Sequence, residues 1–436
     1  MESIYLAAIN KHKHKHRKER LRKQFRLSTS DQSTSSNLLS YSPSSQNSNS
    51  SLKKSKTPIN QVLSSKSKIK ILTDDLLLKV IDLGFLQHKY VLRDWVDINK
   101  LHINLLCKNP NSIEILDEQR IKEEKLSAAE YEKLWPHKKL NWQLLSSNPN
   151  AIYLLAKKII KENDLTESAL NWINDTDKIN WDIVSANPKA ILLLKANESK
   201  INWGIFSGNP KIDLELLERK IKEEDSIATK ELKYSKKLNW FLLSSNPKVF
   251  KVLEQHQHNI NISCLCSNTN PSAIKLIKQL ITNGSKDIDW KRLCENPKAI
   301  EILNENPEEI RYYFLSGNKN GIELIKKQIK YEETLTTDKL STLKNKIDWS
   351  ELSGNPNAVK LLEELLITKY EIYYNKINWI ILSGNPKAIN LLTKYSHKID
   401  MEFLYTNPYA IKLFKKRQAE LNWKLISSNP CIFKKQ

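Results

Sequence analysis

Apolar residues recur along the chain in a short pattern that repeats from about residue 101 to the C-terminus. The clearest copy is Ile377–Leu392, which reads INWIILSGNPKAINLL. Trp379 and Leu382 lie three residues apart, a spacing that places both side chains on one face of a short helix. The segment Ala388–Leu392 then continues with the spacing of a wide apolar stripe on a second helix. The pattern therefore predicts a unit of two short helices.

Polar residues mark where each helix of this unit begins and ends. Asn378 is expected to cap the first helix by accepting a hydrogen bond from an early backbone N–H. Gly384 offers the left-handed conformation that ends a helix at low cost. Because proline has a helical φ and no N–H to satisfy, Asn385 and Pro386 are expected to start the second helix.

The Asn-Pro pair of this unit marks a tandem array. Its asparagines are Asn109, Asn148, Asn187, Asn209, Asn246, Asn270, Asn296, Asn355, Asn385, Asn407 and Asn429, and Asn318 is a twelfth start in which lysine replaces proline. Eight of the eleven tryptophans occupy the slot of Trp379. Successive starts are 22 to 39 residues apart, and the larger gaps are the 22-residue unit plus an insert, mostly of about 15 residues. A fixed period in this range predicts stacked units that cannot bury their apolar faces alone.

These blocks resemble the Asn-Trp/Asn-Pro repeat proteins that giant DNA viruses encode in many copies. The resemblance rests on the Ile-Asn-Trp, Leu-Ser-Gly-Asn-Pro and Ala-Ile-x-Leu-Leu blocks and covers roughly residues 101–433. It implies a helical repeat architecture and a viral origin, and it supplies no site residues. The tryptophan is missing at Ile103, Ile262, Tyr312 and Met401, where packing is expected to be less regular.

The repeats predict an all-α fold, an α-solenoid of about twelve short two-helix repeats over residues 99–436. At roughly 10 Å per stacked unit this would be an elongated, curved rod on the order of 100 Å long. Residues 70–98 are expected to form a helical cap over the first repeat. The last repeat, Leu421–Phe433, lacks a full second helix and is expected to end the array.

The inserts between repeats are related to one another. Arg120–Glu124, Lys220–Glu224 and Ile329–Glu333 read RIKEE, KIKEE and IKYEE, and Ile160–Glu162 is a shorter echo. We expect these segments to lengthen the second helix and to return through a polar loop. The resulting hairpins should project from one edge of the array.

The first 69 residues differ in kind from the repeats. Lys11–Arg26 reads KHKHKHRKERLRKQFR, and Ser28–Ser51 is rich in Ser, Asn and Gln. Residues 1–70 contain 15 Lys and Arg against 3 Asp and Glu, so they carry +12 of the chain's net charge of +21. Such a segment cannot bury enough apolar surface to offset its ordering entropy, which predicts a disordered basic tail.

Three sets of basic residues are candidate contacts for an anionic partner, one in the tail and two in the repeats. In the tail they are Lys11, Lys13, Lys15 and Arg17, which could act as a nuclear-localisation or nucleic-acid-contacting arm or be a solvated extension. In the repeats they directly follow the Asn-Pro pair: Lys189, Lys211, Lys248, Lys298 and Lys387. A second column precedes the Ile-Asn-Trp block: Lys100, Lys139, Lys178, Lys200, Lys237, Lys346, Lys376 and Lys398. Stacking would make both columns positive ridges, unless exposed slots are simply filled by lysine in a lysine-rich chain.

Residues that carry chemistry are not arranged in a catalytic pattern in this sequence. There is no Gly-rich phosphate loop, no kinase or hydrolase signature and no paired-carboxylate motif, so we expect no enzyme activity, cofactor, metal or small-molecule substrate. Cys107, Cys266 and Cys294 fall where other repeats carry serine, which favours structural thiols. The odd total of five cysteines and the missing signal peptide favour an intracellular protein of the host cytoplasm or nucleus, not a secreted one. No apolar run approaches the ~18 residues of a membrane span.

The repeat architecture and the missing catalytic pattern favour a non-enzymatic protein–protein interaction scaffold, encoded by a virus. One alternative is a nucleic-acid-associated basic protein that uses the tail and the lysine ridges. Another is an F-box-like ubiquitin-ligase adaptor, because Leu72–Ile81 resembles the opening of an F-box. Tryptophans at a fixed core-facing slot are expected to pack, and the repeated asparagines to cap helices.

Overall fold

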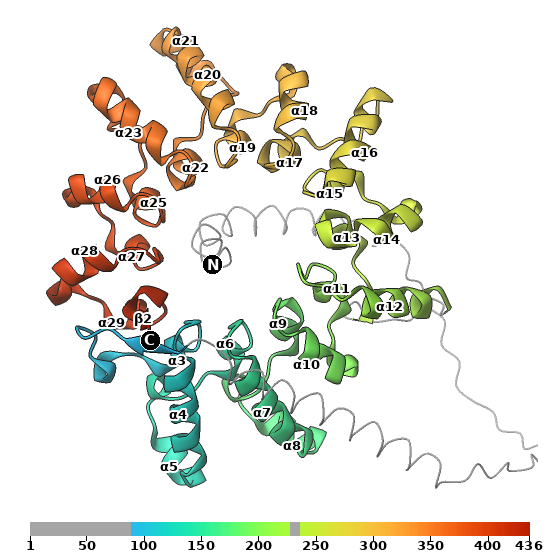
Figure 1. The fold of residues 1–436 in the computed structure, drawn as a ribbon, viewed down its shortest axis with the longest axis vertical. Coiled ribbons are helices and arrows are strands. Elements are labelled where there is room, and N and C mark those ends of the chain that lie inside the picture. The colour runs from blue at the N-terminus through green and yellow to red at the C-terminus, as the bar shows by residue number, and fades with distance from the viewer. Residues whose placement is uncertain (1–88, 227–235) are drawn as a thin grey trace, which may run out of the picture. The chain divides into compact units, whose positions relative to one another are not determined.

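The computed structural model describes residues 89–226 and 236–436, which lie within one compact unit of the chain. The predicted tail, most of the predicted cap and the F-box-like stretch lie outside the described residues. Within them the all-α repeat fold is confirmed, because short helices follow one another in pairs from residue 103 to the C-terminal region (Figure 1).

Each repeat begins with a short first helix. These helices are α3 (Ile103–Leu106), α6 (Trp142–Leu145), α9 (Trp181–Ala186), α11 (Trp203–Phe206), α13 (Trp240–Ser245), α15 (Ile262–Leu265), α17 (Trp290–Glu295), α19 (Tyr312–Leu315), α22 (Trp349–Gly354), α25 (Trp379–Ser383), α27 (Met401–Leu404) and α29 (Trp423–Ile426). The expected cap is confirmed: the Asn378 side chain accepts the backbone N–H of Ile381, and Asn or Asp does the same in most other repeats. Trp379 and Leu382 are buried, as their spacing predicts.

Eleven repeats continue into a second helix. These are α4 (Ile113–Glu124), α7 (Ile152–Asn163), α10 (Ile191–Ala196), α12 (Leu214–Ser226), α14 (Phe250–Gln255), α16 (Pro271–Thr282), α18 (Ile300–Glu305), α20 (Ile322–Glu333), α23 (Val359–Thr368), α26 (Ile389–Lys394) and α28 (Ile411–Lys416). Where the sequence has an insert, the second helix is longer and often returns through another short helix, as expected. The return helices are α5 (Ala128–Lys133), α8 (Glu167–Trp172), α21 (Thr337–Thr342) and α24 (Tyr370–Tyr373).

The turn between the two helices differs from the expectation. Gly384 has φ −80° and ψ −9°, so it is right-handed, and Gly284 alone among the described glycines has a positive φ. Glycine relieves a tight contact at 384, because a Cβ there would lie 3.0 Å from Oγ1 of Thr406 in the next repeat. The second helix begins only at Ile389, so Asn385 and Pro386 lie in a turn closed by the Ala388 N–H and the Asn385 carbonyl at 3.1 Å.

The repeated asparagine joins neighbouring repeats as well as shaping its own turn. In every repeat its side-chain amide donates to two backbone carbonyls of the preceding repeat; Asn385, for example, donates to Ser353 and Asn355 at 2.9 and 3.2 Å. Its Oδ1 accepts the N–H two residues on, here that of Lys387 at 3.1 Å. We call these residues the rung asparagines. All are at most 4% exposed, so their three hydrogen bonds are made away from water.

The rung asparagine of one repeat lies two residues before the predicted repeat start, so the prediction was wrong there. In the sixth repeat Asn268 donates to the carbonyls of Ser244 and Asn246, whereas the predicted start, Asn270, lies two residues further on. Asn270 instead caps α16, with Pro271 at its first helical position. The Asn270-Pro271 pair therefore starts a helix, and the rung asparagine of this repeat, Asn268, is followed by threonine. With Asn268 as the start, the gap from Asn246 becomes the basic 22 residues.

A second hydrogen-bonded link between neighbouring repeats, which we call the second rung, is made by the residue in the slot of Ser383. The Ser383 hydroxyl donates to the Trp379 carbonyl at 2.8 Å and accepts the backbone N–H of Asp400 in the next repeat at 2.9 Å. The same backbone N–H is accepted by sulfur where cysteine replaces serine, as from Asn141 to Cys107 at 3.3 Å. Cysteine is therefore tolerated in this slot because it provides an acceptor of similar size.

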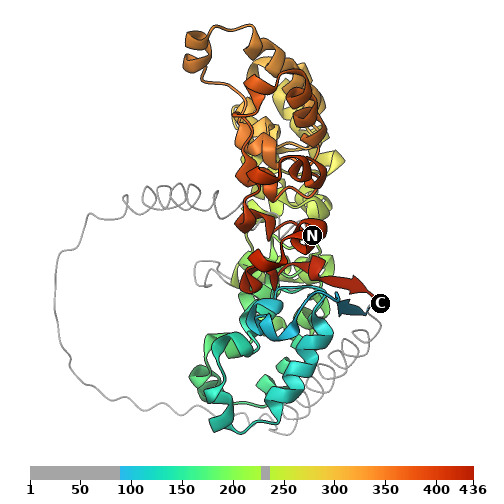
Figure 2. The ribbon, with the colours of Figure 1, turned by 90° about the vertical axis from the view of Figure 1, so that its left-hand side faces the viewer.

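Both rungs also join the last repeat to the first. Asn109 donates to the carbonyls of Ser427 and Asn429 at 3.2 and 2.9 Å, and the His102 N–H donates to Ser427 Oγ at 3.0 Å. Strand β1 (Tyr90–Leu92) pairs antiparallel with β2 (Phe433–Lys435), and Figure 2 shows the two side by side. The described repeats therefore close into a ring, and the expected elongated rod is wrong.

The N-terminal strand completes the last repeat. After α29 this repeat has the 3-10 turn Pro430–Ile432 and β2 in place of a second helix, and β1 pairs with β2. Arg93 supports the junction, because its Nε donates to the Cys431 carbonyl at 2.9 Å. In Figure 1 the first helices lie along the inner side of the ring, and the second helices and hairpins point outward.

Candidate functional site

The five candidate lysines of the repeats occupy one structural slot, two residues after the rung asparagine. All five are exposed, and each backbone N–H donates to the rung asparagine of its own repeat. Three of the side chains reach back to the preceding repeat: Lys189 donates to Asn150 Oδ1 and Lys387 to Asn357 Oδ1, both at 2.7 Å, and Lys248 donates to the Lys211 carbonyl at 3.4 Å. The slot therefore contributes to the contact between repeats, whatever else its lysines do.

Asparagine occupies the same slot in other repeats and also contacts the preceding repeat, so a contact between repeats accounts for the lysines in this slot. Asn150 donates to the Pro110 carbonyl at 2.8 Å, and Asn320 donates to the Pro297 carbonyl at the same distance. The structure brings Lys189, Lys211 and Lys248 into three successive repeats but separates Lys298 and Lys387 from them. The predicted continuous ridge is thus reduced to one arc of three lysines. The tail candidates Lys11, Lys13, Lys15 and Arg17 lie outside the described residues.

Two lysines of the second column pack against the tryptophan of the preceding repeat. The Lys100 ammonium lies 5.3 Å from the ring centre of Trp423, and that of Lys376 lies 5.4 Å from Trp349, in each case the tryptophan of the preceding repeat. A lysine placed over an aromatic face gains a cation–π attraction and shields the ring with its aliphatic stem. These lysines therefore cover the exposed edges of the tryptophan slot as well as adding charge to the surface.

The repeated Glu of the inserts has a structural role that the sequence did not reveal. Oε1 of Glu123, Glu162, Glu224 and Glu332 each accepts a backbone N–H just before the next first helix, at 2.8 to 3.0 Å. Burial raises the pKa of Glu162, although its hydrogen bond from Ile179 opposes the shift. The related insert sequences thus share a carboxylate that ties a long second helix to the following repeat.

The five cysteines are buried and free. Burial raises the pKa of the Cys107 and Cys431 thiols to about 12 and that of Cys266 to about 11. Because the thiolate is the nucleophile and the metal ligand, neutral buried thiols are poor candidates for either role. No three His, Cys, Asp or Glu side chains are grouped for a metal ion in residues 89–226 and 236–436.

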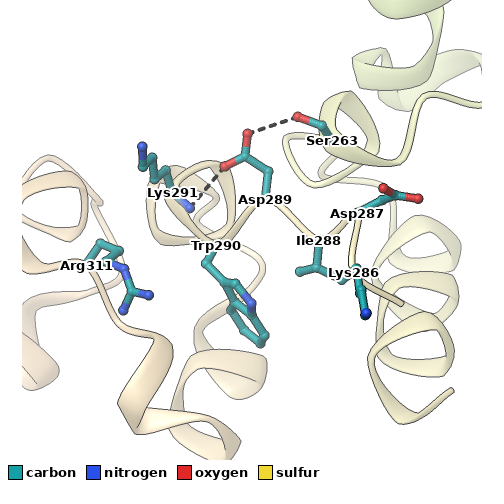
Figure 3. Close-up of a pocket in the computed structure, with 8 residues that line it drawn as sticks. All are labelled: Ser263, Lys286, Asp287, Ile288, Asp289, Trp290, Lys291 and Arg311. Atoms are coloured by element: carbon teal, nitrogen blue, oxygen red, sulfur yellow. Dashed lines mark hydrogen bonds between the residues drawn. The ribbon is translucent and has the colours of Figure 1, made fainter. Parts of the chain in front are cut away.

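A cavity of about 410 Å³ opens around α17, between the sixth and eighth repeats (Figure 3). Its central carboxylate, Asp289, accepts the N–H of Lys291 and of Arg292 at 3.1 and 3.2 Å and the Ser263 hydroxyl at 2.9 Å. Arg311, on the far side, is ion-paired with Glu309 at 2.8 Å. These charged groups cap a helix and join repeats, so the cavity wall is structural.

Large exposed apolar side chains gather on the outward hairpins. Trp135, after α5, is 73% exposed, and Ile367, at the end of α23, is 75% exposed. Further examples on the hairpins are Ile121, Leu165, Tyr331, Tyr370 and Ile372. A smaller group on the inner helices directly follows the tryptophan slot: Phe241, Tyr313 and Ile380. Since isolated apolar residues are normal on surfaces, the concentration on hairpins is the informative feature.

None of the helices described is long and apolar enough to cross a bilayer. Comparisons with protein-family models, with curated proteins and with solved structures gave no match. The candidate surfaces of this ring therefore rest on its own geometry: an inner side of short helices and an outer edge of unequal hairpins.

Proposed function

We propose that the ring is a non-enzymatic scaffold that binds partner proteins through its outward hairpins. The observation that carries this proposal is the exposure of large apolar side chains on those hairpins, with Trp135 and Ile367 about three-quarters exposed. Burying one such side chain against a partner is worth about 1.5–3 kcal/mol. Tryptophan and tyrosine are also the side chains that most often anchor protein interfaces.

Ring closure supports a scaffold because it fixes the hairpins on a common frame. Each repeat is held on both sides by rung asparagines, and the first and last repeats are held by Asn109 and by the β1–β2 pair. A rigid frame lowers the ordering cost of binding, and several hairpins on one frame can bind a multivalent partner. The hairpins differ in length and sequence, so each could bind a different segment.

Photo-crosslinking tests the scaffold directly. A photoreactive phenylalanine analogue at Trp135 of the full chain should yield discrete protein adducts in the cells that express it. The matched control carries the analogue at Lys108, an exposed residue of the first repeat away from the hairpins. Adducts that form equally at both positions, or at neither, would contradict a hairpin-mediated scaffold.

A nucleic-acid-associated role is the second candidate, favoured by the net charge of +12 on residues 1–70. Phosphate binding by such a segment depends steeply on salt. Filter binding of the full chain and of a variant lacking residues 1–69, at several salt concentrations, separates the tail from the ring. The viral origin, the F-box-like adaptor role and the cytoplasmic or nuclear location stay predictions.

A further inference from the structure

The hairpin of α23 and α24 is more apolar than the other hairpins. Its sequence from Leu365 to Tyr374 reads LLITKYEIYY, whereas the corresponding segment after α20 reads TLTTDKLSTL. Ile367, Tyr370 and Ile372 are 75, 39 and 51% exposed. Three large apolar side chains exposed within six residues form a surface that water solvates poorly and that a partner can cover.

Aromatic rings extend this surface onto the next repeat. The ring centre of Tyr370 lies 4.7 Å from that of Tyr374 and 6.3 Å from that of Tyr395, at the end of α26. Tyr374 and Tyr395 are 6.1 Å apart, and both rest on the buried ring of Trp379, at 5.6 and 5.0 Å. We call Ile367, Tyr370, Tyr374 and Tyr395 the tyrosine patch. Because two repeats hold it on a buried tryptophan, the patch is formed before any partner binds.

Cations border the tyrosine patch at fixed positions. The Lys398 ammonium lies 4.7 Å from the ring centre of Tyr374, and that of Lys394 lies 5.6 Å from Tyr395. His397 is 2.9 Å from the Tyr374 hydroxyl. Within the described ranges neither lysine forms an ion pair, whereas Lys369 in the same hairpin is paired with Glu333 at 2.8 Å. The border therefore has two lysines without an ion-pair partner in the described residues, against one carboxylate close to Tyr370, that of Glu371.

We propose that the tyrosine patch binds an acidic, amphipathic segment of a partner protein. Apolar side chains of that segment pack on Ile367 and the tyrosine rings, and its carboxylates pair with Lys394 and Lys398. This inference rests on the scaffold function and deepens it, because it assigns one binding surface and the chemistry of its ligand.

The composition of the patch favours a peptide over a nucleic acid. Nucleic-acid bases stack on exposed aromatic faces. Here the tyrosine rings pack on one another, at 32° for Tyr370 and Tyr374, 54° for Tyr374 and Tyr395 and 21° for Tyr370 and Tyr395, so they cover part of one another's faces. The most exposed member, Ile367, is aliphatic and matches the aliphatic or aromatic side chains of a peptide.

Selection from a random peptide library tests the proposal without a known partner. Displayed 12-residue peptides are selected on the immobilised full chain and, in parallel, on an Ile367→Ser variant. We expect the wild type to enrich peptides with two or more Asp or Glu and spaced Leu, Phe or Trp, and the variant to lose that enrichment. Enrichment of basic peptides, or identical pools from both proteins, would overturn the proposal.

Fluorescence polarisation with the most enriched acidic peptide then measures each contribution. Ile367→Ser should weaken binding at least tenfold, and the double variant Lys394→Gln/Lys398→Gln should weaken it and flatten its dependence on salt. Ile98→Ser is the matched control, an isoleucine 44% exposed in the 3-10 turn Ile98–Lys100 and outside the hairpins, and should bind as the wild type does. Equal loss in the control, or displacement of the peptide by single-stranded DNA, counts against the proposal. Persistent crosslinks at Trp135 without peptide enrichment would refute the patch and leave the scaffold standing.

Discussion

Replacing Asn109 with alanine tests whether the array is closed. Asn109 is fully buried and makes three hydrogen bonds: its amide donates to Ser427 and Asn429, and its Oδ1 accepts the Asn111 N–H at 3.1 Å. In an open array the first two would not exist, because the last repeat would be far from the first. The Asn109→Ala variant leaves the Ser427 carbonyl without this partner, leaves the Asn429 carbonyl with only the long bond from the Ile432 N–H at 3.5 Å, and removes the acceptor of the Asn111 N–H.

The expected loss follows from the number of bonds. A hydrogen bond contributes about 1 kcal/mol net, so Asn109→Ala should lower the free energy of unfolding by about 3 kcal/mol. Asn318→Ala is the matched internal variant, since Asn318 bonds Cys294, Asn296 and Asn320 at 2.8 to 3.0 Å. Lys211→Ala, at an exposed slot, should change stability by less than about 0.5 kcal/mol.

Urea unfolding followed by tryptophan fluorescence gives the three free energies. Energy transfer between dyes on Lys89→Cys and Gln436→Cys reports the junction itself, and the buried native cysteines should leave these two sites to label selectively. In the Asn109→Ala variant we expect energy transfer between the dyes to be lost at a lower urea concentration than the one at which the tryptophan fluorescence changes. A cost for Asn109→Ala near that of Lys211→Ala, beside a cost of about 3 kcal/mol for Asn318→Ala, would refute ring closure.

Three further predictions concern single slots. Glu162→Ala should cost about 1–2 kcal/mol because the Ile179 N–H loses its acceptor, whereas Glu162→Gln keeps an acceptor. Burial raises the pKa of Glu162 in the folded state, so the stability that the protonated carboxyl contributes is present below the unfolded pKa and is lost as pH rises through the folded pKa. The melting temperature of Glu162→Gln should therefore rise relative to that of the wild type between pH 4 and pH 7. Cys107→Ser should change the melting temperature little, and in the wild type this thiol should resist iodoacetamide until the chain unfolds, as read by mass spectrometry. Gly384→Ala should cost about 1–3 kcal/mol by forcing repeats apart, and Thr406→Ala in the same chain should restore part of it in urea unfolding; additive losses would contradict the contact.

Local signals in the sequence determined the repeats and most of their helices. Asn378 and Trp379 predict a capped first helix because the cap and its N–H lie within three residues of each other. The apolar spacing of Ala388–Leu392 predicts a buried second helix, and Ala388, Leu391 and Leu392 are buried. The inserts predict longer helices with returns, because their polar and apolar residues keep the helical period.

Signals that depend on a neighbouring repeat were misassigned. Asn385 was expected to cap a helix, yet its amide satisfies carbonyls of the preceding repeat. Gly384 was expected to end a helix by its conformation, yet it makes room for Thr406. Asn270 carried the more typical Asn-Pro sequence, yet Asn268 forms the rung. In each case the partner atom belongs to another repeat, and no spacing within one unit reveals it.

The sequence by itself determined the unit, the number of units and the places where hairpins project. Only the tertiary structure decided that the units close into a ring, that the N-terminal strand completes the last repeat, and that the tyrosine patch spans two repeats. The physical reason is that ring closure follows from small rotations between units, which add up over twelve repeats. Each rotation is set by side-chain packing between neighbours, such as that of Gly384 on Thr406, and not by the period of any one segment.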